Sequence, residues 1–409
     1  MDRQQSNVPR FGIVADDLTG ALDTGLQFAR TGLETMVHLS PSSDDTDVLV
    51  LDSESRNLSG TIAYDRVREA AAFLGGRVVY KKIDSTLRGN IGFELDAVMD
   101  ELSLRRALVT PALPAYGRTL TDGRLHVNGT PLRETDFTDD PLCPSTDHLP
   151  TLLARQSRRR VGHIRREVVA QGGETLARTI EQRAEGILVI DASTQGHLRT
   201  IADAAAALAG HSVSCGSAGL ACALPLGFGI DADEPRLRQM PAKGGPVLII
   251  AGSRRDVTLR QIERAISARG AALVEMDPLQ IESTVGIVAR ETRNLLSESK
   301  TVIVTTAFKP FVAEKAQAIA QSLGDVVARV VETRPLSGLV LTGGDVAVAV
   351  CRELDVSSIR IEGETAPGVP IGTIIGRRHG DLRLITKAGG FGDEDVLIRA
   401  IDYLRGADD

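Results

Sequence analysis

Tryptophan is absent from the sequence, and aromatic residues make up only 3% of its 409 residues. Proteins that stack nucleic-acid bases or sugar rings need exposed aromatic side chains, so both kinds of binding surface are disfavoured. The sequence also has no excess of basic residues: 47 Lys and Arg stand against 54 Asp and Glu, which gives a net charge of −7. Nucleic-acid binding usually needs a basic surface, so we expect no nucleic-acid partner.

Cysteine is also scarce, with four residues and no C-x-x-C pair. This spacing excludes a disulfide framework and a zinc site, and it suits a reducing compartment. Long apolar runs are missing too, since none reaches the roughly 18 residues that a membrane-spanning helix needs. The first ten residues are polar, which is not the pattern of a signal peptide. We therefore expect a cytoplasmic protein with no membrane partner.

Short apolar runs alternate with amphipathic stretches in the first half of the chain. Strands are predicted at 11–16, 35–40, 47–52, 78–84, 107–112 and 186–192, and helices at 19–31, 61–74, 90–102 and 196–209. Strands that are apolar on both faces and alternate with helices indicate a mostly parallel sheet covered on both sides.

The same pattern starts again near residue 246. Strands are predicted at 246–253, 271–277, 301–307, 338–345 and 383–392, and helices at 256–269, 283–297, 311–323, 345–354 and 393–405. The segment 225–246 is rich in Gly and Pro and has no period, as in a linker. The fold class is therefore α/β with two domains, each a mostly parallel sheet flanked by helices. Their predicted bounds are 1–225 for the first domain, 226–245 for the linker and 246–409 for the second.

Ligands of open α/β sheets bind at the carboxyl ends of the strands, so the residues that follow strands are the candidates. Asp16 and Asp17 end the first strand. Neighbouring side chains there point opposite ways, so one carboxylate could cap the next helix while the other faces a ligand. Capping with an ordinary polar loop is the alternative, since Asp favours both.

The loop after the strand 78–84 carries more chemistry. Lys82 stands in an apolar strand, where an ammonium is costly unless it is paired or faces a polar site. Lys82 and Asp84 share one face of the strand, and Ser85, Thr86 and Arg88 follow. This one loop therefore combines a cation that could bind a carboxylate (Lys82), an acid that could accept a hydroxyl proton (Asp84) and an arginine that could bind an anion (Arg88). A structural salt bridge with a helix cap remains the alternative.

Arg56 follows the strand 47–52 at the same rim and could bind a carboxylate with two hydrogen bonds. On its own it is a weak signal.

Three Gly-containing turns follow strands in the second half, and each leads toward a helix. Their backbone amides suit phosphate, although Gly is common in such turns and each turn alone says little. Together they favour nucleotide binding. The candidate residues are Ser253, Thr342, Gly343, Gly344, Asp345, Lys387, Gly389, Gly390, Phe391 and Gly392.

Other familiar signatures are missing. The sequence has no P-loop, no G-x-G-x-x-G, no H-E-x-x-H and no G-x-S-x-G. The basic run 158–160, with Arg165 and Arg166, is interpreted as a solvated helix face.

Seven segments in order carry a resemblance to a known family. They are ADDLTGALD (15–23), KKIDSTLRGNIGFEL (81–95), PALPAYGR (111–118) with NGTPL (128–132), CGSAGLA (215–221), AGSRRDVTLRQI (251–262), LTGGDVA (341–347) and TKAGGFGDEDVL (386–397). From about residue 11 to 405 the chain resembles the four-carbon acid sugar kinases. The resemblance implies an N-terminal acid-sugar-binding domain and a C-terminal nucleotide-binding domain. It also implies transfer of the γ-phosphoryl group of ATP, with Mg²⁺, to the 4-hydroxyl of a tetronate.

The resemblance also bears on the substrate. The branch that acts on 3-oxo-tetronates typically has a C-S-T-F-D-S-type sequence where this chain has residues 82–86, and the departure favours D-threonate or D-erythronate. A 3-oxo-tetronate 4-kinase and a non-catalytic acid-sugar sensor are the alternatives. Expected substrate-binding residues are Asp16, Asp17, Arg56, Lys82, Asp84, Ser85, Thr86 and Arg88, with Asp17 or Asp84 as the catalytic base. Metal ligands are not legible in the sequence, and a homodimer is compatible with it.

Overall fold

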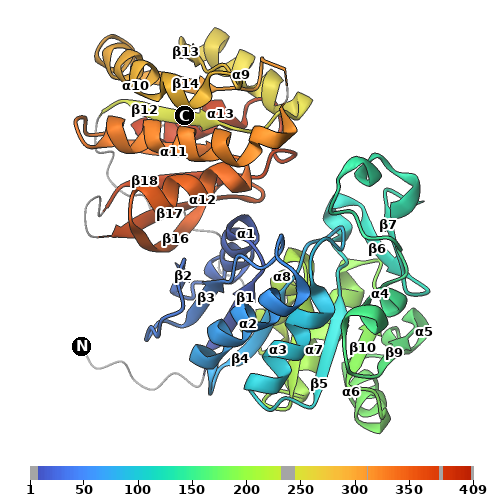
Figure 1. The fold of residues 1–409 in the computed structure, drawn as a ribbon. Coiled ribbons are helices and arrows are strands. Elements are labelled where there is room, and N and C mark those ends of the chain that lie inside the picture. Colours follow the sequence, from blue (N-terminus) through green and yellow to red (C-terminus); the bar gives the residue numbers. More distant parts are fainter. Residues whose placement is uncertain (1–7, 232–244, 311, 377–380, 407–409) are drawn as a thin grey trace, which may run out of the picture. The chain divides into compact units, whose positions relative to one another are not determined.

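The computed structural model describes residues 8–231, 245–310, 312–376 and 381–406. The chain divides into two compact units, unit 1 (residues 1–235) and unit 2 (residues 236–409), coloured blue to green and yellow to red in Figure 1. Most of the predicted linker, 226–245, lies outside the described residues. Residues 226 and 227 complete the helix α8 (Ala218–Gly227), which continues past its internal Pro225.

Unit 1 is built on a fully parallel sheet. Among the described residues its eight strands lie in the order β2-β3-β1-β4-β11-β5-β10-β9. They are β1 (Phe11–Ala15), β2 (Thr35–His38), β3 (Val48–Asp52), β4 (Val78–Lys82), β5 (Arg106–Thr110), β9 (Val161–Ile164), β10 (Ile187–Ile190) and β11 (Ser212–Gly216). β1, β3 and β10 are buried along their whole length, so the sheet is covered on both faces.

Two layers of helices cover this sheet. In one layer α1, α8, α7 and α6 pack side by side, and in the other α2, α3 and α4 do so (Figure 1). The remaining bounds are α1 (Leu18–Ala29), α2 (Gly60–Ala71), α3 (Ile91–Glu101), α4 (Leu149–Gln156), α5 (Arg166–Val169), α6 (Gly173–Gln182) and α7 (Gln195–Ala207). A small antiparallel sheet of β6 (Arg118–Thr121), β7 (Arg124–Val127) and β8 (Thr130–Pro131) is inserted after β5.

Unit 2 has a mixed sheet in the order β13-β14-β12-β15-β18-β17-β16. The first five strands are parallel, and β17 and β16 are antiparallel additions. The strands are β12 (Val247–Ala251), β13 (Ala272–Glu275), β14 (Thr301–Thr305), β15 (Gly338–Thr342), β16 (Val356–Ala366), β17 (Val369–Gly376) and β18 (Arg383–Lys387). The β16–β17 hairpin needs Gly372, because a Cβ there would lie 2.5 Å from Cγ2 of Ile359.

The helices of unit 2 also form two layers. α10, α11 and α12 pack in one layer, and α9 and α13 in the other (Figure 1). Their bounds are α9 (Asp256–Arg269), α10 (Ile281–Glu298), α11 (Ala316–Val331), α12 (Gly344–Glu353) and α13 (Val396–Arg405). Among the described helices of the chain, none is long and apolar enough to cross a bilayer.

Two local interpretations of the sequence were wrong. The helix expected at 311–323 is α11, which runs on to Val331. Its internal Gly324 is a site of close packing, since a Cβ there would lie 3.0 Å from the carbonyl of Ala349. The basic run 158–160 is not a helix face. It leads into the edge strand β9, and Arg158 and Arg159 pair with acidic residues of α3.

In both units there are neighbouring strands whose following helices lie on opposite faces of the sheet. In unit 1, β1 leads to α1 and its neighbour β3 leads to α2, which belongs to the other layer. In unit 2, β12 leads to α9 and β15 leads to α12. Loops that diverge in this way leave a crevice outside the carboxyl ends of the strands, where ligands of open α/β sheets bind.

Candidate active site

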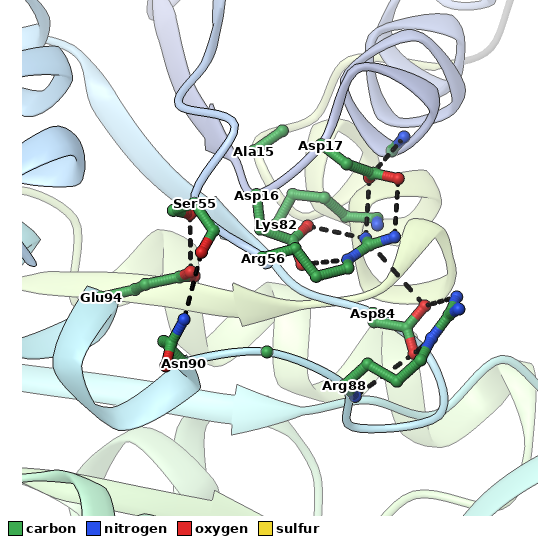
Figure 2. A network of polar contacts seen from close by, with 12 residues as sticks. Ala15, Asp16, Asp17, Ser55, Arg56, Lys82, Asp84, Arg88, Asn90 and Glu94 are labelled. Carbon is green, nitrogen blue, oxygen red and sulfur yellow. Dashed lines mark hydrogen bonds and ion pairs between the residues drawn. The ribbon is translucent and has the colours of Figure 1, made fainter. Parts of the chain in front are cut away.

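In unit 1, Arg56 binds two neighbouring carboxylates at the end of β1 (Figure 2). Its Nε and Nη2 donate to Asp16 at 2.7 and 2.9 Å, and its Nη1 and Nη2 donate to Asp17 at 2.6 and 2.7 Å. Asp17 also caps α1 by accepting a hydrogen bond from the amide of Gly20 at 2.9 Å. Asp16 is buried, whereas Asp17 keeps 25% of its side chain exposed. The guanidinium of Arg56 therefore holds both Asp16 and Asp17, the two carboxylates that the sequence predicted at this strand end.

The charges of this group are mutually stabilised. Burial alone would raise the pKa of Asp16, but Arg56 and Lys82 outweigh it and lower that pKa. Burial would likewise lower the pKa of Arg56, but Asp16 and Asp17 raise it well above the usual value. Asp16 is thus a charged hydrogen-bond acceptor at neutral pH.

Asp84, after β4, is held by residues of its own loop. It accepts hydrogen bonds from the amide and hydroxyl of Thr86 at 3.0 and 2.5 Å and from Nε and Nη2 of Arg88 at 3.0 and 2.9 Å. Burial would raise the pKa of Asp84, but Arg88 and Arg56 hold it well below its ordinary value. Arg88 also donates to Asp140 at 3.0 Å. Ser85, which follows Asp84 in the same loop, is half-buried.

Lys82 differs from the other charged groups of the site. It is 5% exposed, and in the described part of the chain no hydrogen bond or ion pair joins its Nζ to another residue. Its charge nevertheless lowers the pKa of Asp16 and of Asp23, so the ammonium lies near both. The ammonium thus has negative charge nearby but, among the described residues, no hydrogen-bond acceptor, and a ligand that supplies one would stabilise it.

The sequence analysis did not single out Asp23 and Asp52. Burial raises the pKa of Asp23 to about 6, against the opposing charge of Lys82. Asp52 ends β3 beside Ala15, and burial raises its pKa well above the usual value. The strand-end rule itself pointed to Asp52. Asp23 lies in α1, the helix that directly follows Asp16 and Asp17, so a signal existed for each.

A buried polar chain lies beneath the loop that carries Arg56 (Figure 2). Nζ of Lys81 pairs with Glu94 at 2.8 Å, and both side chains are at most 1% exposed. Glu94 accepts a hydrogen bond from the hydroxyl of Ser55 at 2.6 Å, and the side-chain amide of Asn90 donates to the carbonyl of Ser55 at 3.1 Å. These contacts fix the backbone next to Arg56. Lys81 pairs with Glu94 and Lys82 does not, which is consistent with the alternation of neighbouring side chains along a strand.

Substituting Gly20 should test the position of Lys82. A Cβ at residue 20 would lie 2.6 Å from Nζ of Lys82 and 2.5 Å from Oδ1 of Asp17, so both groups must move. We expect Gly20→Ala to lower kcat/KM for the acid substrate by about 10²-fold, as for other displacements of about 1 Å. Steady-state kinetics would measure it, with Gly75→Ala as control, since a Cβ there would meet no atom within 4 Å and its φ is −53°. A variant with unchanged kcat/KM would contradict the placement.

Asp23 predicts a pH-dependent effect on stability. Its folded-state pKa is raised by burial to about 6, so its favourable contribution is lost as the pH rises through that value. We expect Asp23→Asn to raise the free energy of unfolding by on the order of 2 kcal/mol at pH 8 and by about 1 kcal/mol less at pH 5. Urea denaturation at both pH values measures this. The exposed Asp65→Asn is the control, and an equal gain at both pH values would argue against a raised pKa of the half-buried Asp23.

The three turns expected to bind nucleotide lie together in unit 2. They follow the neighbouring strands β12, β15 and β18. The amide of Gly252 donates to the carbonyl of Thr342 at 3.0 Å, and the amide of Gly343 donates to the carbonyl of Lys387 at 3.1 Å. A Cβ on Gly389 would lie 2.2 Å from Oγ of Ser253, so the first and third turns are in contact.

The candidate residues of these turns differ in exposure. Gly343 (φ +100°) precedes α12, and Gly344 and Asp345 form its first turn with Asp345 exposed. Thr342 is fully buried, and its hydroxyl has no hydrogen-bond partner among the described residues. Gly390 is exposed.

The third turn also contains Phe391 and Gly392, both half-buried, the latter with φ +78°. Lys387 is buried beneath them, and this burial lowers its pKa to about 8.

Both units match described protein families. A sugar-binding N-terminal domain matches residues 11–224, and a nucleotide-binding C-terminal domain matches residues 248–397. A D-threonate kinase of Salmonella typhimurium is 36% identical over 96% of this chain and 97% of its own length. The chain belongs to the four-carbon acid sugar kinase family. A D-threonate kinase of Bordetella bronchiseptica (34% identical, 97% and 98% covered) and a D-erythronate kinase of Heliobacterium modesticaldum (33%, 96% and 96%) are further relatives.

The fold agrees with this family. A crystal structure from Salmonella typhimurium, described as a putative tRNA synthase, superposes with a TM-score of 0.82 over 96% of this chain and 98% of the other. At 24% identity this similarity shows the fold alone. The predictions of a two-domain α/β fold and of a carbohydrate-acid kinase are confirmed, and as a kinase the protein uses ATP.

Proposed function

We propose that this four-carbon acid sugar kinase phosphorylates the 4-hydroxyl of D-threonate, or of D-erythronate, and releases the 4-phosphate and ADP. The observation that carries the proposal is Lys82, a buried ammonium that has no partner in the described chain and lies near charged carboxylates. The names of the relatives support it, since two at 36% and 34% identity are D-threonate kinases. The residues 82–86, which depart from the 3-oxo-tetronate pattern, support it as well.

The chemistry of unit 1 suits such a substrate. A tetronate offers one carboxylate and several hydroxyl groups. In our proposal Lys82 binds the carboxylate, helped by Arg56 and Arg88, because charged hydrogen bonds to a carboxylate are strong. Asp16 accepts hydrogen bonds from hydroxyl groups, and the half-buried hydroxyl of Ser85 and that of Thr86 complete the set.

Asp17 is the proposed catalytic base. It is partly exposed, whereas the pKa of Asp84 is held well below its ordinary value, which makes Asp84 a poor proton acceptor. Asp17 would orient the 4-hydroxyl and take its proton, and Asp84 would hold Arg88 in position. Phosphoryl transfer depends mainly on such positioning and on neutralising charge.

ATP is proposed to bind the three turns of unit 2 through their backbone amides, which suit phosphate oxygens. Mg²⁺ would accompany the nucleotide. Among the described residues no group of three or more His, Cys, Asp or Glu could hold a metal ion by itself. This fits Mg²⁺, which keeps several waters and binds through substrate phosphates and one or two carboxylates. Asp345, exposed in the first turn of α12, is the proposed carboxylate.

A coupled assay of ADP release with a panel of four-carbon acids tests the proposal. D-threonate, D-erythronate and the 3-oxo-tetronates would each be supplied with ATP and Mg²⁺. We expect the highest kcat/KM with D-threonate or D-erythronate. A clear preference for a 3-oxo-tetronate would replace the proposed substrate. Tight binding of an acid with no ADP release from any acid would indicate a sensor instead of a kinase.

A further inference from the structure

The ammonium of Lys387 lies inside the turn that it precedes. Its Nζ donates to the carbonyls of Ala388, Gly389 and Phe391 at 3.1, 3.2 and 3.2 Å. An ammonium has three hydrogens, and here each has a carbonyl acceptor. Lys387 is only 2% exposed, so its head group is enclosed by the turn.

Two buried side chains of α9 hold the same turn from the same side. The hydroxyl of Thr258 donates to the carbonyl of Gly389 at 2.9 Å. The amide group of Gln261 donates to the carbonyls of Phe391, Gly392 and Asp393 at 3.2, 3.2 and 2.8 Å. Thr258 and Gln261 are fully buried. Four carbonyls of the turn 388–392, and that of the following Asp393, therefore face the interior of unit 2.

The amides of the turn have few acceptors. The amide of Phe391 donates to the carbonyl of Ala388 at 3.0 Å, whereas no hydrogen bond from the amides of Gly389, Gly390 or Gly392 is present among the described residues. Successive amides whose carbonyls are turned away form a concave anion-binding arrangement. A positive charge enclosed beneath them adds to the attraction for phosphate.

We propose that Lys387 is a positioning residue for the nucleotide: it holds the turn 388–392 from within, so that the turn amides bind the phosphates, and does not touch the nucleotide itself. This inference rests on the proposed nucleotide site of unit 2. Support of the turn by Lys387 can be distinguished from direct binding of the nucleotide by Lys387. If Lys387 only supports the turn, replacing another supporting side chain, such as Gln261, should also weaken ATP binding.

Calorimetric titration of the full chain with ATP and Mg²⁺ tests this inference in the wild type and in the variants Lys387→Met, Lys387→Arg and Gln261→Met. We expect Lys387→Met to weaken ATP binding by about tenfold or more and Gln261→Met by roughly three- to tenfold. Lys387→Arg should not restore binding, because a guanidinium is too large for a cage of carbonyls at 3.1–3.2 Å. In the double variant Lys387→Met/Gln261→Met, the loss of binding free energy should be smaller than the sum of the two single losses, since both side chains act on one turn.

Thr292→Val on α10 is the matched control. Thr292 is buried, and its hydroxyl has no partner in the described part of the chain, so ATP affinity should stay at the wild-type value. Thermal unfolding and circular dichroism identify variants that do not fold. If Lys387→Met does not fold, the ATP affinity of Gln261→Met tests the inference in its place. Full binding by Lys387→Arg together with unchanged binding by Gln261→Met would show direct contact and overturn the inference. If the wild type binds no ATP, the proposed nucleotide site fails as well; if it binds and all variants bind equally, the inference alone fails.

Discussion

Lys82→Met is expected to lower kcat/KM for the four-carbon acid by roughly 10²- to 10³-fold and to leave ATP affinity unchanged. Removing one partner of a buried, hydrogen-bonded charge pair usually has an effect of this size. In the described part of the free protein Nζ of Lys82 makes no hydrogen bond or ion pair, although its charge stabilises the carboxylates of Asp16 and Asp23. Urea denaturation of Lys82→Met therefore accompanies the kinetics, and we expect the main deficit when substrate binds. Steady-state kinetics with either substrate varied, and calorimetry with ATP alone, measure the two quantities.

Lys300→Met provides the control for Lys82→Met. Lys300 is exposed in unit 2, so its replacement should change neither constant. Two results would contradict our assignment of Lys82. One is a wild-type kcat/KM for the acid in Lys82→Met. The other is an equal loss of ATP affinity, which would move Lys82 from the acid site to the nucleotide site.

Lys81→Met is expected to lower the free energy of unfolding by about 3–5 kcal/mol. The pair of Lys81 and Glu94 is buried, and removing one member leaves the other charge uncompensated. The double variant Lys81→Met/Glu94→Leu should recover much of this loss, because replacing a whole buried ion pair by apolar groups is often neutral. Urea denaturation of the single and double variants measures the difference. A Lys81→Met variant as stable as the wild type would show that the pair is not buried as described.

The same variants separate folding from catalysis. Glu94 holds the hydroxyl of Ser55, which adjoins Arg56. The double variant should therefore remain less active toward the acid than the wild type even where its stability recovers. A double variant with full activity would mean that the buried chain does not position Arg56.

Much of the fold followed from hydrophobic patterning alone. Strand β1 was expected at 11–16 and spans Phe11–Ala15, and the helix α9 lies at the predicted 256–269. The strands β9 and β11 were missed because they are short and contain Gly, Ser or His. Such strands are recognised by their neighbours in the sheet and not by their own composition.

The candidate site was predictable in its residues and less so in their pairing. The strand-end rule selected Asp16, Lys82 and Asp84, which do lie at one rim. That Arg56 binds both Asp16 and Asp17 could not be read from the sequence, because it depends on a loop that follows a neighbouring strand. The loop geometry is also special, since Glu54 (φ +46°) adopts a conformation that favours glycine.

In unit 2, the contacts of Lys387 were likewise not predictable from the sequence. Lys387 was included among the nucleotide-binding candidates because it begins a Gly-containing turn. The enclosure of its ammonium by carbonyls depends on Gln261 and Thr258, more than 120 residues earlier in the chain. Long-range support of this kind has no signature in the local sequence.

The most direct test of the account is the identity of the product. The wild-type enzyme would be incubated with ATP, Mg²⁺ and D-threonate and followed by phosphorus NMR. We expect one new phosphomonoester signal, coupled to the protons on C4, that grows in step with ADP. ADP accompanied only by inorganic phosphate, or a phosphate on any other oxygen of the acid, would contradict the account.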